Sequence, residues 1–150
     1  MNNLLLIELI LVATILWIGF VAAISFMEAW LKFRAPGVTL QLGLGIGQLV
    51  FKALNKVELV LAFIIGIIGF LTQDSWNGLE YVLYFIALGV LLLQTFWLLP
   101  VLDKRIKAHL DNIPLPKSNT HFIYVAAELV KVFSLVMCAV HILRSINAII

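Results

Sequence analysis

The sequence predicts an all-α fold: an integral membrane four-helix bundle whose helices run antiparallel in up-down-up-down order. Of the 150 residues, 63% are hydrophobic and 12% are charged, whereas a soluble domain carries about 25% charged residues. The apolar residues gather into four segments long enough to cross a hydrocarbon core of about 30 Å. The basic residues fall mainly in the links between these segments. Lipid is therefore the solvent that the chain requires, and helices satisfy their own backbone groups within it.

The first predicted helix covers about residues 4–30. No charged residue occurs among the 19 positions from Leu9 to Met27, which would span about 28 Å as a helix. A cleavable signal peptide is the alternative interpretation of an apolar segment at this place in the chain. No basic residue precedes the segment, and Glu28-Ala29-Trp30 lacks the small residues of a cleavage site. We therefore expect the helix to be retained.

Residues 38–52 carry an unusual pattern. Leucine or isoleucine alternates with glycine or glutamine from Leu40 to Gly47, and a period of two residues is typical of a β-strand. A lone strand in lipid would leave its backbone groups unpaired, at a cost of several kcal/mol per group. We therefore predict an interfacial segment over 38–52, formed either as a surface helix or as a long lead-in to the second membrane helix.

Three further membrane helices are predicted, over about residues 53–72, 79–102 and 119–143. The first of these three has small residues along one side, Ala62, Gly66 and Gly69, and this pattern permits close helix packing. A polar loop over 103–118 is expected to separate the third membrane helix from the fourth. The whole chain, 1–150, then forms a single transmembrane domain.

The orientation of the bundle follows from the basic residues, which are retained on the cytoplasmic side of a membrane. Nine of the ten basic residues lie in the links, at the helix ends or in the C-terminal tail, and the tail contains one of them, Arg144. The other eight flank two links on one face: Lys32, Arg34, Lys52, Lys56, Lys104, Arg105, Lys107 and Lys117. We therefore predict that both termini lie on the non-cytoplasmic side of the inner (plasma) membrane.

The lipid bilayer is the partner that the composition requires. The net charge is only +2, and the basic residues are spread over short loops, so the sequence has no stripe suited to a nucleic acid backbone. The single cysteine, Cys138, excludes an internal disulfide and is expected to be a small buried apolar group. The sequence leaves open whether the chain forms a homo-oligomer or is a subunit of a membrane complex.

Seven polar side chains are candidate ligand-binding residues, because an ionisable group in hydrocarbon costs at least about 2.5 kcal/mol and is rarely incidental. They are Glu28, Lys52, Asn55, Glu58, His121, Glu128 and Lys131. Glu128 and Lys131 lie three positions apart and so share a helix face, as do Asn55 and Glu58. We expect the three carboxylates and His121 to share one polar pocket that opens toward the cytoplasm.

Three interpretations of this pocket stay open at the level of the sequence. In a structural network, Glu128 pairs with Lys131. Glu58 then pairs with Lys52 or Lys32. In a functional pathway, the pocket handles a proton, an ion or a small ligand. A carboxylate-bridged di-metal centre needs a Glu-x-x-His pair, which the sequence lacks, so we assign no metal ligands, cofactor or catalytic residue.

Most of the chain resembles an uncharacterised family. The residues that carry the likeness are Leu16-Trp17-Ile18-Gly19-Phe20-Val21-Ala22 in the first helix, Gly47 with Val50-Phe51 before the second, and Trp97-Leu98-Leu99-Pro100 closing the third. They are similar to those of the four-helix membrane proteins grouped with transmembrane protein 205 and its bacterial relatives. The resemblance implies a four-helix inner-membrane protein without an agreed biochemical activity.

A second, local resemblance covers residues 51–58, Phe-Lys-Ala-Leu-Asn-Lys-Val-Glu. This segment is similar to the Arg-Ala-x-x-Asn-x-x-Glu segment that opens the second helix of MAPEG proteins, the membrane-associated enzymes of eicosanoid and glutathione metabolism. The resemblance implies an alternative function, a divergent MAPEG-like glutathione-dependent membrane enzyme in which Asn55 and Glu58 contact glutathione. Phe51 stands where that family has its arginine.

Overall fold

The computed structural model describes residues 3–72, 76, 78–111, 113 and 119–149. Within these ranges the secondary structure is entirely helical, and no strand is present. The elements are α1 (Asn3–Val21), η1 (Ala22–Glu28), α2 (Ala29–Leu31), η2 (Lys32–Arg34), α3 (Leu40–Leu71), α4 (Gly78–Leu93), η4 (Gln94–Leu98), α5 (Leu99–Leu110) and α6 (Thr120–Ile149). The elements from α1 to η2 follow one another directly, as do α4, η4 and α5, so the described chain folds as four long helices.

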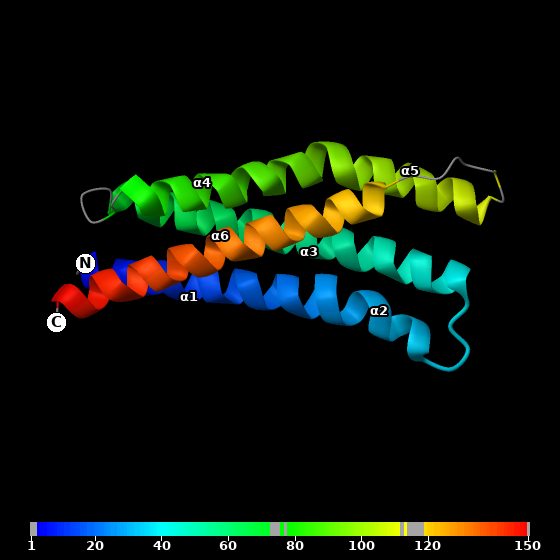
Figure 1. The fold of residues 1–150 in the computed structure, drawn as a ribbon, viewed down its shortest axis with the longest axis horizontal. Coiled ribbons are helices and arrows are strands. Elements are labelled where there is room, and N and C mark those ends of the chain that lie inside the picture. The colour runs from blue at the N-terminus through cyan, green and yellow to red at the C-terminus, as the bar shows by residue number, and fades with distance from the viewer. Residues whose placement is uncertain (1–2, 73–75, 77, 112, 114–118, 150) are drawn as a thin grey trace.

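The four long helices form one bundle (Figure 1). The chain leaves the N-terminus along α1 and α2, returns along α3, leaves again along α4 and α5, and comes back along α6. Both termini lie at one end of the bundle, which we call the terminal end. The opposite end, where η2 connects to α3, is called the loop end. The prediction of an all-α four-helix bundle is confirmed.

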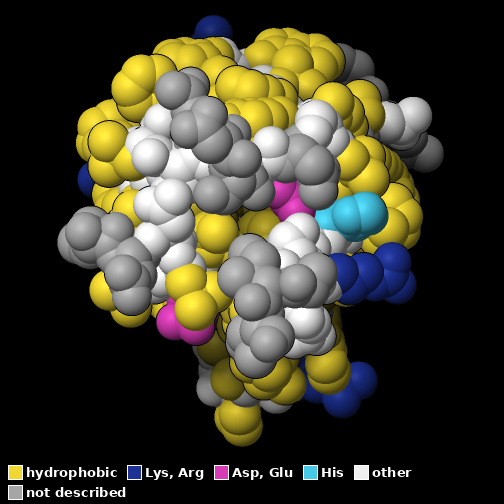
Figure 2. Space-filling view, turned by 90° about the vertical axis from the view of Figure 1, so that its left-hand side faces the viewer, with side chains coloured by type: hydrophobic (Ala, Val, Ile, Leu, Met, Phe, Trp, Pro, Cys, Tyr) yellow, Lys and Arg dark blue, Asp and Glu magenta, His cyan; other side chains and the backbone are white. Residues whose placement is uncertain are grey.

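Each long helix is apolar enough to cross a membrane. The candidate spans are Asn3–Arg34, Leu40–Leu71, Gly78–Leu110 and Thr120–Asn147, of 32, 32, 33 and 28 residues. At about 1.5 Å per residue, all four exceed a hydrocarbon core of about 30 Å. Large apolar side chains are exposed on each helix in turn, for example Ile15, Phe63, Phe96 and Phe133. Seen from the terminal end, hydrophobic side chains cover much of the rim of the bundle (Figure 2). These are the features of a multi-pass membrane protein whose outer surface contacts lipid.

The start of α3 corrects the predicted interfacial segment. Residues 40–52 form the first turns of this helix, so the lead-in alternative applies and the expected helix start at residue 53 is wrong. Thr39 caps the helix, because its side-chain oxygen accepts a 3.2 Å hydrogen bond from the backbone N–H of Leu42. This bond satisfies one of the N–H groups that a helix start leaves without an internal partner.

The glycines of this lead-in serve helix packing. A Cβ added at Gly43 would overlap the ring of Phe33, and one added at Gly47 would lie 2.7 Å from Nζ of Lys32. Both glycines therefore face the end of the preceding long helix, which approaches α3 closely at these two turns. Gly45, between them, has nothing within 4 Å, so the close approach involves the i,i+4 pair Gly43 and Gly47 and not every glycine of the alternation.

The third long helix extends beyond its predicted end at residue 102. The predicted polar loop, 103–118, begins with two further helical turns, because α5 continues to Leu110. Pro100 stands in the first turn of α5, directly after the π-helical η4, and the long helix continues through it. Lys107 and His109 lie in the last turn, near the negative end of the helix dipole. Most of the remaining predicted loop lies outside the described residues.

Candidate functional site

A polar cluster lies between the four long helices, and each helix contributes to it. Its members are Trp17 of α1, Glu58 of α3, Gln94 of η4, and Glu128 and Lys131 of α6. We call these five residues the central cluster. No member is more than 1% exposed. Four chain segments that are distant in sequence thus bury their polar groups at one place.

The ammonium group of Lys131 stands at the centre of the cluster. It donates a 2.7 Å hydrogen bond to Oε1 of Gln94, forms an ion pair with Oε1 of Glu58, and lies 3.1 Å from Oε2 of Glu128. An ammonium has three N–H donors, and three side chains surround this one. Glu58 is held from a second side by Trp17, whose Nε1–H donates a 2.8 Å hydrogen bond to Oε1 of Glu58.

Helical spacing and two wide turns bring these side chains together. Glu128 and Lys131 lie three residues apart on the buried face of α6. Gln94 opens the π-helical η4, and the π-helical η1 begins just over one turn after Trp17. A π turn inserts a residue and redirects the neighbouring side chains, and such turns are frequent at functional sites.

Three polar atoms of the central cluster have no hydrogen-bond partner among the residues that the structure describes. They are both carboxylate oxygens of Glu128 and Nε2 of Gln94, and all three are shielded from solvent. Oε2 of Glu128 makes the ion-pair contact with Lys131. A buried polar atom without a partner costs about 1–3 kcal/mol. Glu128 is therefore the member with unused capacity to bind.

The central cluster lies deep in the membrane span and is closed toward the terminal end. Glu58 lies about 20 Å along the helix axis from the terminal end of α3. Between the cluster and that end, the helices pack through apolar side chains that are at most 2% exposed: Ile10, Ile65, Ala87, Leu91, Leu135 and Ile142. This apolar layer separates the cluster from the terminal end.

A cavity of about 240 Å³ lies on the opposite side of the cluster, toward the loop end. We call it the loop-end cavity. Apolar side chains form most of its wall, and its polar lining residues are Lys32, Gln48, Asp103 and His121. Asp103 accepts a 2.7 Å hydrogen bond from Gln48 and pairs with Lys52 at 2.5 Å. His121 is exposed in the first turn of α6.

The predicted site residues therefore lie at two levels, not in one pocket. Glu58, Glu128 and Lys131 meet in the central cluster, as their burial in a membrane span led us to expect. Glu28 lies at the loop end instead. Its Oε2 is 3.2 Å from Nζ of Lys32, one turn later on the same long helix. The expectation of a single pocket that also contains Glu28 and His121 is wrong. Whether these residues bind a ligand stays a prediction.

The expected partner of Glu58 also needs correction. Glu58 pairs with Lys131, not with Lys52 or Lys32. Each of those two lysines has a nearer carboxylate at the loop end, Asp103 for Lys52 and Glu28 for Lys32. The expected pair of Glu128 with Lys131 is present.

Asn55 joins α3 to the third long helix one turn before Glu58. Its side-chain N–H donates a 2.9 Å hydrogen bond to Oγ1 of Thr95, and that hydroxyl donates a 2.7 Å hydrogen bond to the carbonyl oxygen of Leu91. Asn55 thus reaches a backbone carbonyl only through Thr95. The two residues implied by the MAPEG resemblance, Asn55 and Glu58, thus have partners within the chain, and their contact with glutathione stays a prediction.

Sequence reasoning missed Trp17 and Gln94. In both cases the position of the residue within an apolar span could have identified it. Trp17 lies in the middle of an apolar span, whereas membrane tryptophans gather at the interfaces. Gln94 is the single amide in a run of 22 uncharged residues from Tyr81. A polar group in hydrocarbon requires a partner, so each position could have been listed beside the buried charges.

Glu80 is a second buried carboxylate that the sequence analysis did not single out. It is 2% exposed in the first turn of α4, and Ser145 of α6 donates a 3.2 Å hydrogen bond to its Oε1. Cys138 is buried nearby, with its Sγ 4.0 Å from the carbonyl oxygen of Glu80, as expected for a small buried thiol. In the described part of the chain, no group of three or more His, Cys, Asp or Glu side chains is suited to a metal ion.

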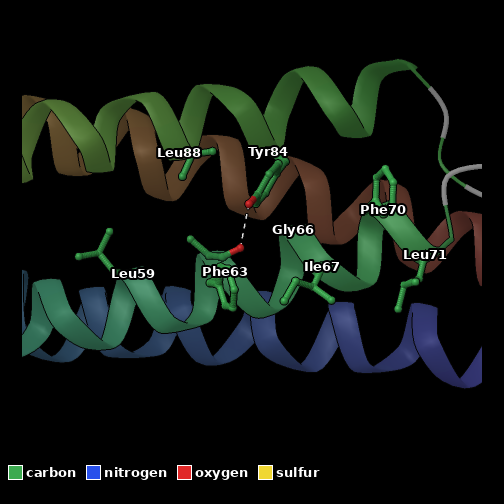
Figure 3. A pocket seen from close by; sticks show the side chains of 9 residues that line it. Leu59, Phe63, Gly66, Ile67, Phe70, Leu71, Tyr84 and Leu88 are labelled. Atoms are coloured by element: carbon green, nitrogen blue, oxygen red, sulfur yellow. Dashed lines mark hydrogen bonds between the residues drawn. The ribbon is translucent and has the colours of Figure 1, made fainter.

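A larger cavity, of about 450 Å³, opens between α3 and α4 (Figure 3). Its lining is apolar apart from the hydroxyl of Tyr84, which donates a 2.8 Å hydrogen bond to the carbonyl oxygen of Ala62. Gly66 leaves room for this hydroxyl, because a Cβ there would lie 2.8 Å from it. Phe63 and Phe70 line the cavity and are exposed on the lipid-facing surface. Its described lining has no acid or base, so the central cluster is the stronger candidate site.

Neither a scan against protein-family models nor searches among curated proteins and solved structures found a match for this chain. The functional argument therefore depends on the central cluster and the loop-end cavity themselves. The two family resemblances stay predictions.

Proposed function

We propose that this chain is a proton-handling membrane protein whose central cluster binds and releases one proton within the membrane. The observation that supports the proposal is the charge count of the cluster. Two carboxylates, Glu58 and Glu128, share one ammonium, Lys131, and all three are at most 1% exposed. With every group ionised, one negative charge would stay uncompensated, which costs several kcal/mol in a low-dielectric interior. A single proton on the carboxylate pair removes this charge.

Glu128 is the group best suited to carry the exchangeable proton. Glu58 already accepts contacts from both Lys131 and Trp17. Glu128 has one ion pair, with Lys131, and its other polar neighbour is Tyr124, which carries no charge to stabilise the ionised carboxylate. When Glu128 is protonated, Glu58 and Lys131 form a neutral pair. Proton release then changes the charge of the whole cluster, which is how intramembrane carboxylates couple protons to transport.

Infrared difference spectroscopy between acid and alkaline pH tests this function. The solubilised wild-type chain should show the C=O band of one solvent-shielded protonated carboxyl group, and the band should disappear as the proton is released. Glu128→Gln should lose the band. Glu80→Gln removes a buried carboxylate outside the cluster and should keep it. Absence of the band in the wild type, or its persistence when Glu58 and Glu128 are both glutamine, would show that the cluster holds no exchangeable proton.

We also infer that the protein lies in the inner (plasma) membrane with the loop end in the cytoplasm and both termini outside. Eight of the nine basic residues of the links and tail support this orientation. Under it, the loop-end cavity faces the cytoplasm and the apolar layer lies toward the outside.

Single-cysteine reporters test the orientation. In a Cys138→Ser background, cysteines at Ser75 and Ser118 should react with a membrane-impermeant thiol reagent from opposite sides, with Ser118 cytoplasmic. By sequence, these positions belong to the α3–α4 and α5–α6 connections, and they lie outside the described residues. Reaction of both from the same side would contradict four membrane crossings.

A further inference from the structure

An aromatic pair lies at the loop-end cavity. Phe51 of α3 lines the cavity, and its ring packs edge-on against Tyr124 of α6, with 5.4 Å between ring centroids and 70° between ring planes. Tyr124 is only 3% exposed. The ring of Phe51 therefore stands between the open space of the cavity and the buried tyrosine.

Tyr124 lies between Phe51 and the central cluster. It lies one turn before Glu128 on α6, and it interacts electrostatically with the carboxylates of both Glu128 and Glu58. Its phenol is the polar group next to Glu128 on the cavity side. A phenol can accept a proton at its oxygen while it donates its own, which is the property that a relay between water and a buried carboxylate requires.

Two ion pairs lie at the cavity. Glu28 of η1 pairs with Lys32 of η2, and Lys52 of α3 pairs with Asp103 of α5. On α6, His121 lies one turn before Tyr124 and lines the cavity. The two ion pairs add no net charge of their own, and Lys107 adds a positive charge that acts on Asp103.

We propose that the loop-end cavity is the entrance to the central cluster, that Tyr124 passes protons to Glu128, and that Phe51 restricts this transfer. In the inward step, the hydroxyl proton of Tyr124 moves to a carboxylate oxygen of Glu128, and the tyrosine oxygen takes a proton from a hydronium ion in the cavity. One O–H bond breaks and one forms at each transfer, and no electrons are exchanged. The apolar layer closes the other side, so exchange takes place from the loop end. This inference rests on the proposed function of the cluster.

The rate of proton exchange tests the entrance, whereas the size of the carboxyl band tests the cluster. After a pH jump, Phe51→Ala should release the proton about tenfold faster than the wild type, because the restricting ring is gone. Tyr124→Phe keeps the ring and removes the relay hydroxyl, so release should be about tenfold slower or more. Both variants should keep the full amplitude of the band, since Glu128 is unchanged.

Two matched variants control for general effects of these substitutions. Phe133→Ala removes a lipid-facing phenylalanine of α6, and Tyr84→Phe removes a buried hydroxyl far from the cavity. Both should release the proton at the wild-type rate. If Phe51→Ala and Tyr124→Phe match these controls while the band is intact, the entrance is wrong and the proton site stands. If the wild type lacks the band, the proposed function itself is wrong.

A labelling experiment tests the entrance without any proton measurement. Gln48 lines the cavity, so a cysteine at Gln48 in the Cys138→Ser background should react with a small charged thiol reagent added on the loop side. A cysteine at Ala87, which lies in the apolar layer, should not react from either side. Failure of the Gln48→Cys variant to react, in protein that keeps its wild-type melting temperature, would overturn the open entrance.

Discussion

Replacing Lys131 with methionine should lower the free energy of unfolding by about 3–5 kcal/mol. The change leaves Glu58 and Glu128 buried in one cluster without their shared cation, and it removes the donor to Gln94. Methionine retains most of the apolar stem of lysine, so the loss reports chiefly the missing charge and only slightly a cavity. Thermal and chemical unfolding in detergent micelles measures the effect.

Neutralising the carboxylates as well should restore most of this loss. Because Lys131 contacts both acids, adding Glu128→Gln should recover part of the stability, and adding Glu58→Gln as well should recover most of it. Lys56→Met, at an exposed position of α3, should change the stability by less than about 0.5 kcal/mol. Strictly additive losses across the series would mean that the three side chains are not partners.

The second large effect is expected at Trp17. Trp17→Phe keeps an aromatic ring but removes the N–H that binds Glu58, and hydrogen bonds to charged groups contribute about 1.5–3 kcal/mol. Trp17→Ala also removes a fully buried side chain and leaves a cavity, so its total loss should reach about 3–5 kcal/mol. The order of melting temperatures should be wild type, Trp17→Phe, Trp17→Ala.

A matched tryptophan separates the hydrogen bond from the general effect of the substitution. Trp97 is 52% exposed in η4, so Trp97→Phe should lower the stability by less than about 0.5 kcal/mol. Equal stability of Trp17→Phe and the wild type would remove Trp17 from the energetics of the central cluster and leave it only a packing role.

The helix boundaries show where local sequence patterns mislead. The four apolar spans were predictable, because in lipid only a helix or a closed barrel satisfies the backbone. The start of α3 was not, because Gly43 and Gly47 make room for Phe33 and Lys32 of the preceding long helix, and no local pattern shows that contact. The end of α5 was also missed, since charged residues at the end of a long helix resemble a polar loop when they are read without their partners, such as Lys52 for Asp103.

Half of the candidate site was accessible from the sequence. The pair of Glu128 and Lys131 follows from their spacing on one helix, and Glu58 was recognisable as an acid in a membrane span. The partners from other helices were not accessible. Lys52 and Lys32 were equally reasonable partners for Glu58, and no local pattern shows that Trp17 and Gln94 point at the same place.

The sequence by itself determined that this protein is a four-helix membrane bundle and that acids and a lysine are buried in it, because composition, span length and the 3.6-residue turn are local properties of the chain. Only the tertiary structure decided that Lys131 lies between two carboxylates and that Phe51, on the wall of the loop-end cavity, packs against Tyr124. The physical reason is that the rotation and axial position of one helix against another depend on side-chain packing and on the two π turns. Neither leaves a periodic trace in the sequence.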